Sequence, residues 1–262
     1  MSRPLDIPHD GIYARKQIYS KSRLVSFSHR RRFQVGLDLV APLVAGKRIL
    51  DYGCGDGSFI HALLAADCAP LEVIGAEISD ALVEDCNRRF PGRADLRFVH
   101  VDRLSDLARQ TPIDLIICME VLEHAVEPER LLDDMYSLVN EGGLVIISVP
   151  VETGPVLLLK QAVRIAVGWR GIGDYRWTSR YSLAEYWKSL FAGPSPHILR
   201  PIHRPPDSLP HHCHKGFNWR YLQSKIAGRF RIRRVFGSPF PGLPPFAGSQ
   251  VWFVAEKVRK SA

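Results

Sequence analysis

The stretch from Ile49 to Phe59, Ile-Leu-Asp-Tyr-Gly-Cys-Gly-Asp-Gly-Ser-Phe, constrains the fold of this chain more than any other part of the sequence. The apolar pair Ile49 and Leu50 is typical of the end of a buried strand, and the apolar residues after Ser58 are spaced as in a helix. Glycine at every second position in between permits a tight turn and a close approach of the backbone to a ligand. A strand, a glycine-rich turn and a helix in this order predict a nucleotide-binding unit, because backbone N–H groups then lie beside the ligand.

Alternating apolar segments continue this pattern along the chain and predict an α/β fold with a doubly wound, mostly parallel sheet. The last two predicted strands are joined by a linker that is too short for a crossover helix, so we expect them to pair antiparallel. Helices are predicted over 25–44, 58–66, 80–90, 127–139 and 218–227, and strands over 47–51, 71–76, 96–101, 113–118, 144–149, 231–236 and 250–256.

Changes of composition divide the chain into four predicted segments. The first begins with a loosely packed leader over residues 1–12, and the third is a cap inserted over the carboxyl ends of the strands. The four are an N-terminal arm and lid helix (1–44), an α/β core (45–150), the inserted cap (151–214), and a C-terminal helix and β-hairpin that complete the core (215–262).

Charge is distributed unevenly. Residues 38–150 carry 9 Lys or Arg against 20 Asp or Glu, and the rest of the chain carries 26 basic against 7 acidic residues. This asymmetry is typical either of solvated basic faces or of a positive surface that meets lipid head groups, a phosphorylated substrate or nucleic acid.

The cysteines and the apolar runs favour a cytoplasmic protein. The five cysteines are odd in number and form no C-x-x-C pair, so we expect reduced thiols. The N-terminus lacks the apolar core of a signal peptide, and no apolar run reaches the roughly 18 residues that span a bilayer.

The arrangement resembles the class I S-adenosylmethionine (SAM) dependent methyltransferases, which implies their Rossmann-like fold over 45–150 and 215–257. The turn Asp51-x-Gly-x-Gly-x-Gly matches the first motif of that family. Glu77, 20 residues after Gly57, matches the acid that holds the ribose hydroxyls, and Asp102 matches the residue beside the adenine. The resemblance implies that the cofactor is SAM and that its binding residues are Asp51, Gly53, Cys54, Gly55, Asp56, Glu77, Ile78, Asp102, Arg103 and Met119.

The chemistry of these residues agrees with SAM. Vicinal hydroxyls need an acceptor pair such as Glu77, although a nicotinamide dinucleotide would use the same acid. The turn lacks the G-x-G-x-x-G spacing of a dinucleotide site, and Asp56 would repel a pyrophosphate. SAM instead carries a sulfonium and an ammonium, for which Asp51 and Asp56 are suitable neighbours.

Glu120, Glu123 and His124 follow the predicted strand 113–118 and are candidates for the reacting end. Methyl transfer to a hydroxyl requires positioning and removal of a proton, and a histidine can accept that proton near neutral pH. We predict Glu123 and His124 as catalytic residues, together with His214. In the alternative interpretation, Glu123 and His124 only support the next helix and the sheet.

A metal site is a second interpretation of the same segment. Glu120, Glu123 and His124, with His212 from the segment 211–214, are ligands that suit a divalent ion. The segment resembles the Glu-x-x-Glu-His of small-RNA 2′-O-methyltransferases and of ubiquinone-pathway O-methyltransferases, in which an ion would hold substrate oxygens. A histidine-rich loop is equally typical of a solvated segment, so we assign no metal.

The cap favours a hydrophobic acceptor. Residues 156–167 have a wide apolar face with Lys160 and Arg164 on a narrow stripe, followed by Trp169, Arg170, Tyr175, Arg176 and Trp177. Such a helix is too short to span a bilayer, but it would fit the interface of an anionic membrane with its basic residues toward the head groups. The alternative is a cap helix that packs on the sheet or on the substrate.

These observations predict a SAM-dependent methyltransferase, similar to the ubiquinone-pathway O-methyltransferases, that methylates an oxygen of a small hydrophobic or lipid-linked acceptor. One alternative is an RNA methyltransferase that uses the basic arm and C-terminal region, although no RNA-binding module is recognisable. The other is a binding module that holds SAM without catalysis.

Overall fold

The computed structural model describes residues 3, 5–110, 112–169, 181–205, 209–240, 242 and 244–258. Contacts within the chain group it into two compact units. Unit 1 comprises residues 1–119, 135–146 and 256–262, and unit 2 comprises residues 120–134 and 147–255.

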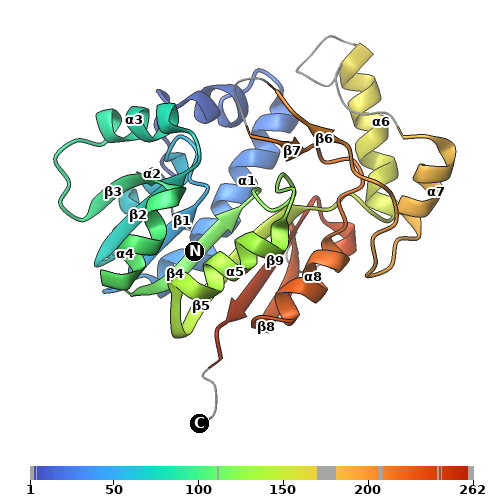
Figure 1. Cartoon of the computed structure of the whole chain (residues 1–262). Coiled ribbons are helices and arrows are strands. Elements are labelled where there is room, and N and C mark those ends of the chain that lie inside the picture. Colours follow the sequence, from blue (N-terminus) through green and yellow to red (C-terminus); the bar gives the residue numbers. More distant parts are fainter. Residues whose placement is uncertain are drawn as a thin grey trace. The chain divides into compact units, whose positions relative to one another are not determined.

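A seven-stranded sheet with the order β3-β2-β1-β4-β5-β9-β8 forms the framework (Figure 1). The strands at the β3 side are parallel, and the pair β9 and β8 closes the sheet antiparallel, which confirms the predicted Rossmann-like fold. The strands are β1 (Arg48–Tyr52), β2 (Glu72–Glu77), β3 (Leu96–His100), β4 (Ile113–Met119), β5 (Val139–Pro150), β8 (Arg231–Ser238) and β9 (Gln250–Glu256).

The parallel register of unit 1 determines where its functional residues meet. Strand β1 pairs with β2 from Arg48 to Tyr52, and β2 pairs with β3 up to Glu77 opposite His100. Because parallel strands have their carboxyl ends at the same edge, the turn after β1, Glu77 and the residues after β3 lie at one edge of the sheet. Strands β1, β2 and β4 are mostly apolar and buried along almost their whole length, as expected for a covered parallel sheet.

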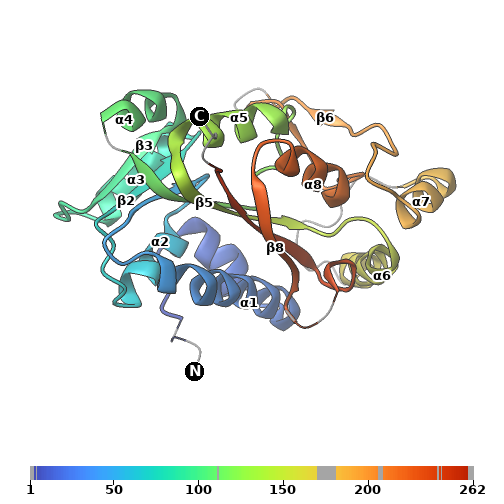
Figure 2. The ribbon, with the colours of Figure 1, turned by 90° about the horizontal axis from the view of Figure 1, so that it is seen from below.

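The helices of unit 1 cover its strands on both sides. Figure 2 shows α1 and α2 on the same side of the strands and α4 on the other. Ser79 caps the helix after β2, because its Oγ accepts a hydrogen bond from Leu82 N at 3.4 Å. The helices are α1 (Arg23–Val40), α2 (Ser58–Ala65), α3 (Asp80–Arg89) and α4 (Leu104–Gln110).

The prediction of a loosely packed leader is wrong for the described part of residues 1–12. Ile7 is buried, and its carbonyl oxygen accepts a hydrogen bond from Tyr19 Oη at 2.6 Å. The Arg3 guanidinium donates to the carbonyl of Ala66 at the end of α2. This leader therefore packs on unit 1, and it leads into the short π-helix η1 (Ala14–Ile18).

Unit 2 contains the predicted helix after β5 and two features that the sequence did not predict. These are the short helix α7 (Leu183–Leu190) and a two-stranded antiparallel sheet of β6 (Ile202–His203) and β7 (His211–His212). The expected elements are α6 (Pro155–Trp169) and α8 (Trp219–Ala227), while α5 (Pro128–Leu138) belongs to both units. The predicted aromatic and basic patch lies outside the described residues, except for the backbone of Trp169.

Among the described residues, no helix has both the length and the apolar character needed to cross a membrane. The five cysteines, all of them among the described residues, form no disulfide with one another. The predicted division into four segments remains a prediction. It is based on changes of composition along the chain, whereas the two units are defined by contacts between residues.

Candidate cofactor site and catalytic cluster

The turn after β1 has the backbone that its sequence predicts. Gly53, Gly55 and Gly57 have φ values of 81°, 56° and 71°, in the left-handed region that glycine adopts without a steric penalty. The N–H groups of Gly53 and Cys54 donate to the carbonyl of Ala76, at 2.8 and 3.0 Å. These two bonds attach the turn to the end of β2. They hold the turn beside Glu77, the acid that closes β2.

Glu77 lies against this turn. Its Oε2 accepts a hydrogen bond from Gly55 N at 2.9 Å, and its Oε1 accepts one from Ile78 N at 2.8 Å. Oε1 also accepts a hydrogen bond from Ser79 N at 3.3 Å. The second lone pair of Oε2 leaves the carboxylate acceptor capacity for a ribose hydroxyl. This geometry fits the predicted role of Glu77, which remains a prediction.

Asp51 supplies buried negative charge at the same edge of the sheet. Its side chain is almost fully buried, and burial together with the nearby charge of Glu77 raises the pKa of Asp51 to about 7. Two carboxylates that repel one another in a buried site are stabilised by a cationic ligand. The sulfonium and ammonium of SAM are such cations, and the donor set of this edge therefore fits the cofactor.

Asp56 is hydrogen-bonded to the N-terminal arm and to the start of α2. Its Oδ2 accepts hydrogen bonds from Tyr13 N at 2.8 Å and Ala14 N at 3.1 Å, and its Oδ1 accepts one from Ser58 N at 3.1 Å. The carboxylate thus caps both η1 and α2, because the first N–H groups of a helix lack intrahelical acceptors. The Asp56 carboxylate thus anchors the N-terminal arm, and its predicted place beside the cofactor remains a prediction.

The remaining predicted cofactor residues lie at or near the same edge. Asp102 follows β3 on a 3-10 turn, with its side chain 86% exposed and one carboxylate oxygen 3.3 Å from His100 Nδ1. Arg103 and Ile78 are also exposed, and Met119 is the last residue of β4. Exposure leaves the Asp102 carboxylate accessible for the predicted contact with an adenine amino group.

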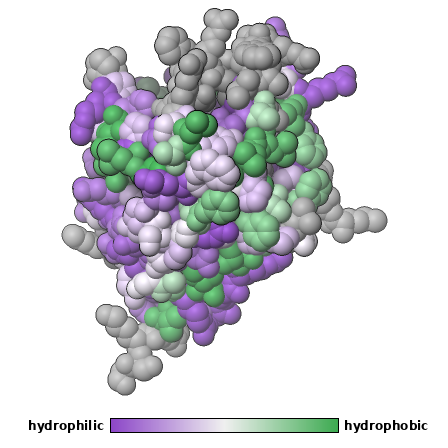
Figure 3. Space-filling model, turned by 90° about the vertical axis from the view of Figure 1, so that its right-hand side faces the viewer, coloured by the Kyte–Doolittle hydropathy of each residue, from purple (hydrophilic) through white to green (hydrophobic). Residues whose placement is uncertain are grey.

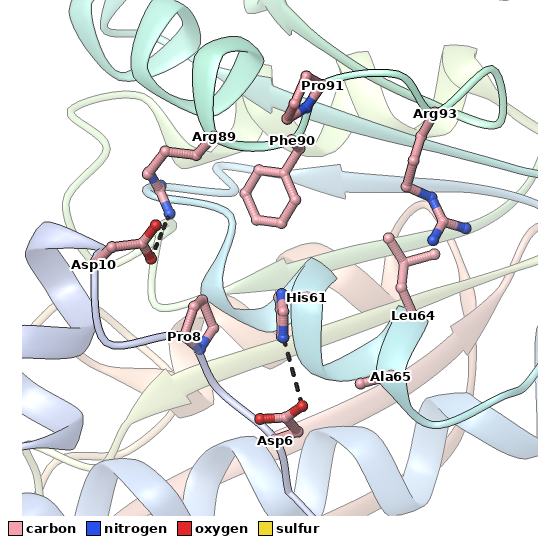
Figure 4. A pocket seen from close by; sticks show the side chains of 10 residues that line it. All are labelled: Asp6, Pro8, Asp10, His61, Leu64, Ala65, Arg89, Phe90, Pro91 and Arg93. Carbon is pink, nitrogen blue, oxygen red and sulfur yellow. Dashed lines mark hydrogen bonds and ion pairs between the residues drawn. The ribbon is translucent and has the colours of Figure 1, made fainter.

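A cleft of about 450 Å³ lies at a different place in unit 1, between the leader, α2 and the end of α3 (Figure 4). Two contacts cross the opening: Asp6 lies 3.7 Å from His61, and Asp10 lies 3.4 Å from Arg89. The cleft contains none of the predicted cofactor or catalytic residues. Its ion pairs attach the leader to α2 and α3.

Arg32, which is buried, and Tyr13, which is half-buried, are polar residues that the sequence analysis did not select. Arg32 lies on the Arg-Arg-Arg run of α1, yet its side chain is buried, donates to Tyr13 Oη and lies 3.1 Å from His29. Arg32 therefore does not belong to the predicted basic surface. The only signal in the sequence was the position of these residues in an arm that precedes the glycine-rich turn.

In unit 2 the structure brings together the three predicted catalytic residues. One ligand atom from each of Glu123, His124 and His214 lies within 4.8 Å of the other two. Glu123 is fully buried, with Oε1 3.8 Å from His124 Nε2, while the side chains of His124 and His214 are 43% and 38% exposed. The cluster therefore has a buried carboxylate and two imidazoles that reach solvent. One carboxylate and two imidazoles could also hold a divalent ion.

The orientation of His124 follows from contacts with a neighbouring segment. His212 N donates to the carbonyl of His124 at 2.9 Å, and His124 Nδ1 lies 2.9 Å from the carbonyl oxygen of His212. A carbonyl oxygen only accepts, so Nδ1 must carry the proton and Nε2 is left with its lone pair. Burial and the neighbouring His214 lower the pKa of His124, which favours its neutral form.

Two residues of the alternative metal set, His212 and Glu120, do not belong to the cluster of three. His212 Nδ1 bonds to the carbonyl of Pro201 at 2.8 Å, and His214 takes the position in the cluster that the sequence had given to His212. Glu120 is not among the three clustered ligands, and its backbone has φ 58°, which is unusual for a residue other than glycine. Residues with such a strained backbone are concentrated at functional sites.

Lys160 and Arg164 do not face head groups as predicted. Both side chains point inward to Glu152, which accepts a hydrogen bond from Lys160 Nζ at 3.0 Å and two from Arg164 at 2.9 and 3.0 Å. The narrow polar stripe of α6 is thus explained by a buried carboxylate three residues before the helix begins.

Comparison with known proteins decides the family. The profile of a methyltransferase domain family matches residues 26–193, which is more than half of the chain. The chain belongs to this family. The matched range includes the glycine-rich turn, Glu77, Asp102 and the segment with Glu123 and His124, and SAM is the cofactor of this methyltransferase fold.

Two curated relatives match this chain over part of their length. The chain is 29% identical over 138 residues to a demethylmenaquinone methyltransferase of Clavibacter sepedonicus, covering 53% of this chain and 55% of the relative. It is 34% identical over 109 residues to a ubiquinone biosynthesis O-methyltransferase of Chromobacterium violaceum, covering 40% of this chain and 45% of the relative. The chain thus spans about half of the length of these relatives.

A solved structure confirms the fold. A SAM-dependent methyltransferase from Listeria monocytogenes, described as putative, superposes with a TM-score of 0.53 at 16% identity, covering 87% of this chain and 98% of that one. The similarity to this structure extends beyond the segment that the curated relatives match.

Proposed function

We propose that this protein transfers the methyl group of SAM to a hydroxyl oxygen of a small hydrophobic or lipid-linked acceptor. The proposal depends most on the cluster of Glu123, His124 and His214. SAM supplies a methyl group that is activated by a positive sulfur. The protein must hold the acceptor and remove the hydroxyl proton.

His124 is suited to accept that proton. Its Nδ1 is held by the carbonyl of His212, so Nε2 carries the lone pair, and the lowered pKa of His124 keeps the ring neutral near pH 7. The carboxylate of Glu123, 3.8 Å from Nε2, would stabilise the imidazolium that forms. We therefore assign His124 as the general base, with Glu123 and His214 as its neighbours at the acceptor.

The names of two relatives and the exposed apolar side chains of unit 2 both support a hydrophobic acceptor. The two curated relatives are named for demethylmenaquinone and for ubiquinone biosynthesis, and both of these quinones are hydrophobic molecules. Leu183 and Trp187 on α7 and Phe191 directly after it follow one another at intervals of four residues and are 84%, 62% and 78% exposed. Figure 3 shows the face that carries α6 and α7, with hydrophobic side chains among hydrophilic ones. Large exposed apolar groups of this kind mark interaction sites.

Charge supports an anionic membrane as the place where such an acceptor is met. Residues 147–255 carry 15 Lys or Arg and only 4 Asp or Glu. Aromatic and aliphatic side chains combined with basic residues bind the interface of anionic bilayers. In this proposal α7, rather than the predicted stripe of α6, contacts the membrane.

Transfer of a radiolabelled methyl group from SAM tests the activity. The substrates are geranyl-substituted catechol, unsubstituted catechol and a short structured RNA. We expect methylation of the geranyl compound above the other two, and methylation of RNA alone would replace our proposal with the RNA alternative. Binding of SAM without turnover on all three substrates would favour the non-catalytic alternative.

His124→Gln tests the base. We expect the rate to fall by about 10²- to 10⁴-fold, as for loss of a general base, with the affinity for SAM unchanged. His203→Gln is the matched control, because His203 is exposed on β6 and lies outside the cluster. If a chelator abolished the wild-type activity and a divalent ion restored it, Glu123, His124 and His214 would act as ion ligands instead.

Flotation with liposomes tests the membrane contact. We expect the wild type to float with vesicles that contain phosphatidylglycerol, and the Leu183→Ser/Trp187→Ser variant to lose this binding. Leu199→Ser is the control, since Leu199 is an exposed leucine outside α7. Equal flotation of both variants would remove α7 from the proposal.

A further inference from the structure

Glu152 is the most strongly compensated buried charge in unit 2. It lies two residues after β5, is fully buried, and accepts three hydrogen bonds from Lys160 and Arg164 on α6. Arg164 binds both carboxylate oxygens in the forked geometry that guanidinium groups favour. Burial alone would raise the pKa of Glu152, but Lys160, His214 and Arg164 lower it far below its ordinary range.

The third neighbour of Glu152 is a predicted catalytic residue. His214 Nδ1 lies 3.8 Å from Glu152 Oε1, and the His214 and His124 rings are tilted against each other with 5.0 Å between their centroids. Glu152, His214, His124 and Glu123 therefore follow one another in unit 2. Carboxylates lie at both ends of this row and imidazoles in the middle.

The segment that carries His214 is held from other sides as well. Arg200 donates to the carbonyl of Cys213 at 3.0 Å, and Gly216 N donates to Tyr181 Oη at 2.9 Å. These contacts fix the backbone, but they leave the rotation of the His214 ring to its side-chain neighbours. Glu152 is the neighbour on the Nδ1 side.

We propose that Glu152 is a positioning residue, which orients the His214 ring and keeps the proton on Nδ1, so that Nε2 is free for the acceptor. A carboxylate beside one ring nitrogen favours the tautomer with hydrogen on that nitrogen. Because Lys160 and Arg164 hold Glu152, the proposal also links helix α6 to the cluster. It rests on the proposed function, in which His214 acts at the acceptor.

The experiment compares Glu152→Gln with the wild type by ¹⁵N–¹H spectroscopy of the histidine rings. The His214 signal is assigned from its loss in His214→Asn. We expect the Nδ1–H tautomer in the wild type and a mixture of tautomers in Glu152→Gln. We expect the rate with geranyl catechol to fall about 10- to 100-fold while KM for SAM stays the same. An unchanged His214 signal in Glu152→Gln would overturn the proposal.

Two further variants separate positioning from folding. Glu185→Gln removes the ion pair with Lys215, at 2.9 Å, next to His214 in the sequence but away from Glu152, and should leave both the tautomer and the rate unchanged. If Glu152→Gln does not fold, Glu152→Gln/Lys160→Met removes one cation together with the anion and is read in the same way. Full activity of His214→Asn would refute the role of His214 in the proposed function, whereas the tautomer measurement would still decide the role of Glu152.

Discussion

Asp51→Asn should stabilise the SAM-free protein in a manner that depends on pH. Asp51 is buried beside Glu77, and burial and this neighbour raise its pKa from 3.8 to about 7. The folded protein therefore holds a proton that the unfolded chain releases between these two values. The wild type loses stability as the pH rises from about 4 to about 7, and the loss is complete above that pH. The Asp51→Asn variant carries no charge at this position, so its stability does not fall with rising pH for this reason.

The magnitude follows from the two pKa values. Each tenfold difference in proton affinity between the folded and unfolded states corresponds to about 1.4 kcal/mol, so the full effect of Asp51 ionisation is about 4 kcal/mol at pH 8. About 1.5 kcal/mol of this is already present at pH 5, because the unfolded carboxyl is ionised there. The advantage of Asp51→Asn over the wild type should thus grow by about 2–3 kcal/mol between pH 5 and pH 8.

Urea unfolding followed by far-ultraviolet circular dichroism measures this difference. Groups away from Asp51 titrate alike in both proteins and cancel when the variant is compared with the wild type at each pH, while the interaction of Asp51 with Glu77 is part of the difference that is measured. Asp106→Asn is the control, since Asp106 is exposed on α4 and should show no such growth. An advantage of Asp51→Asn that is the same at pH 5 and pH 8 would refute the reasoning that Asp51 is a destabilising buried charge.

Three further predictions follow from the same contacts. Calorimetry should show that Glu77→Ala abolishes SAM binding, and unchanged affinity would reject the site. SAM should bind the wild type more tightly as the pH rises from 6 to 8, because the ionised form of Asp51 attracts the cation, and Asp51→Asn should show a flat profile; a rise in both proteins would assign the effect elsewhere. In Gly11→Ala the new Cβ would lie 2.2 Å from Asp56 Oδ2, which should cost about 1–3 kcal/mol by overpacking and speed tryptic cleavage of the arm. Gly193→Ala, where no atom lies within 4 Å, should leave cleavage unchanged, and equal rates in both variants would contradict the anchoring role of Asp56.

The local residue pattern and the order of the predicted strands and helices along the chain determined much of the fold of this protein. The turn after β1 needs glycine wherever φ is positive, and an acid that closes β2 must lie beside that turn because the strands are parallel. Both properties follow from a few adjacent residues and the right-handed connection of strands through helices. The mostly parallel sheet with its antiparallel closing pair, and the edge at which the turn and Glu77 meet, were therefore predictable from the sequence.

Contacts between distant segments were decided only by the tertiary structure. His212 and His214 are two residues apart and chemically identical, yet only His214 reaches Glu123 and His124, because a carbonyl of the segment before β6 occupies His212. The Asp56 carboxylate accepts hydrogen bonds from the arm, more than 40 residues earlier, which the sequence did not predict. Lys160 and Arg164 turned inward because a buried carboxylate lies beside α6. The direction of a polar side chain depends on its nearest compensating partner, and packing brings that partner from another part of the chain.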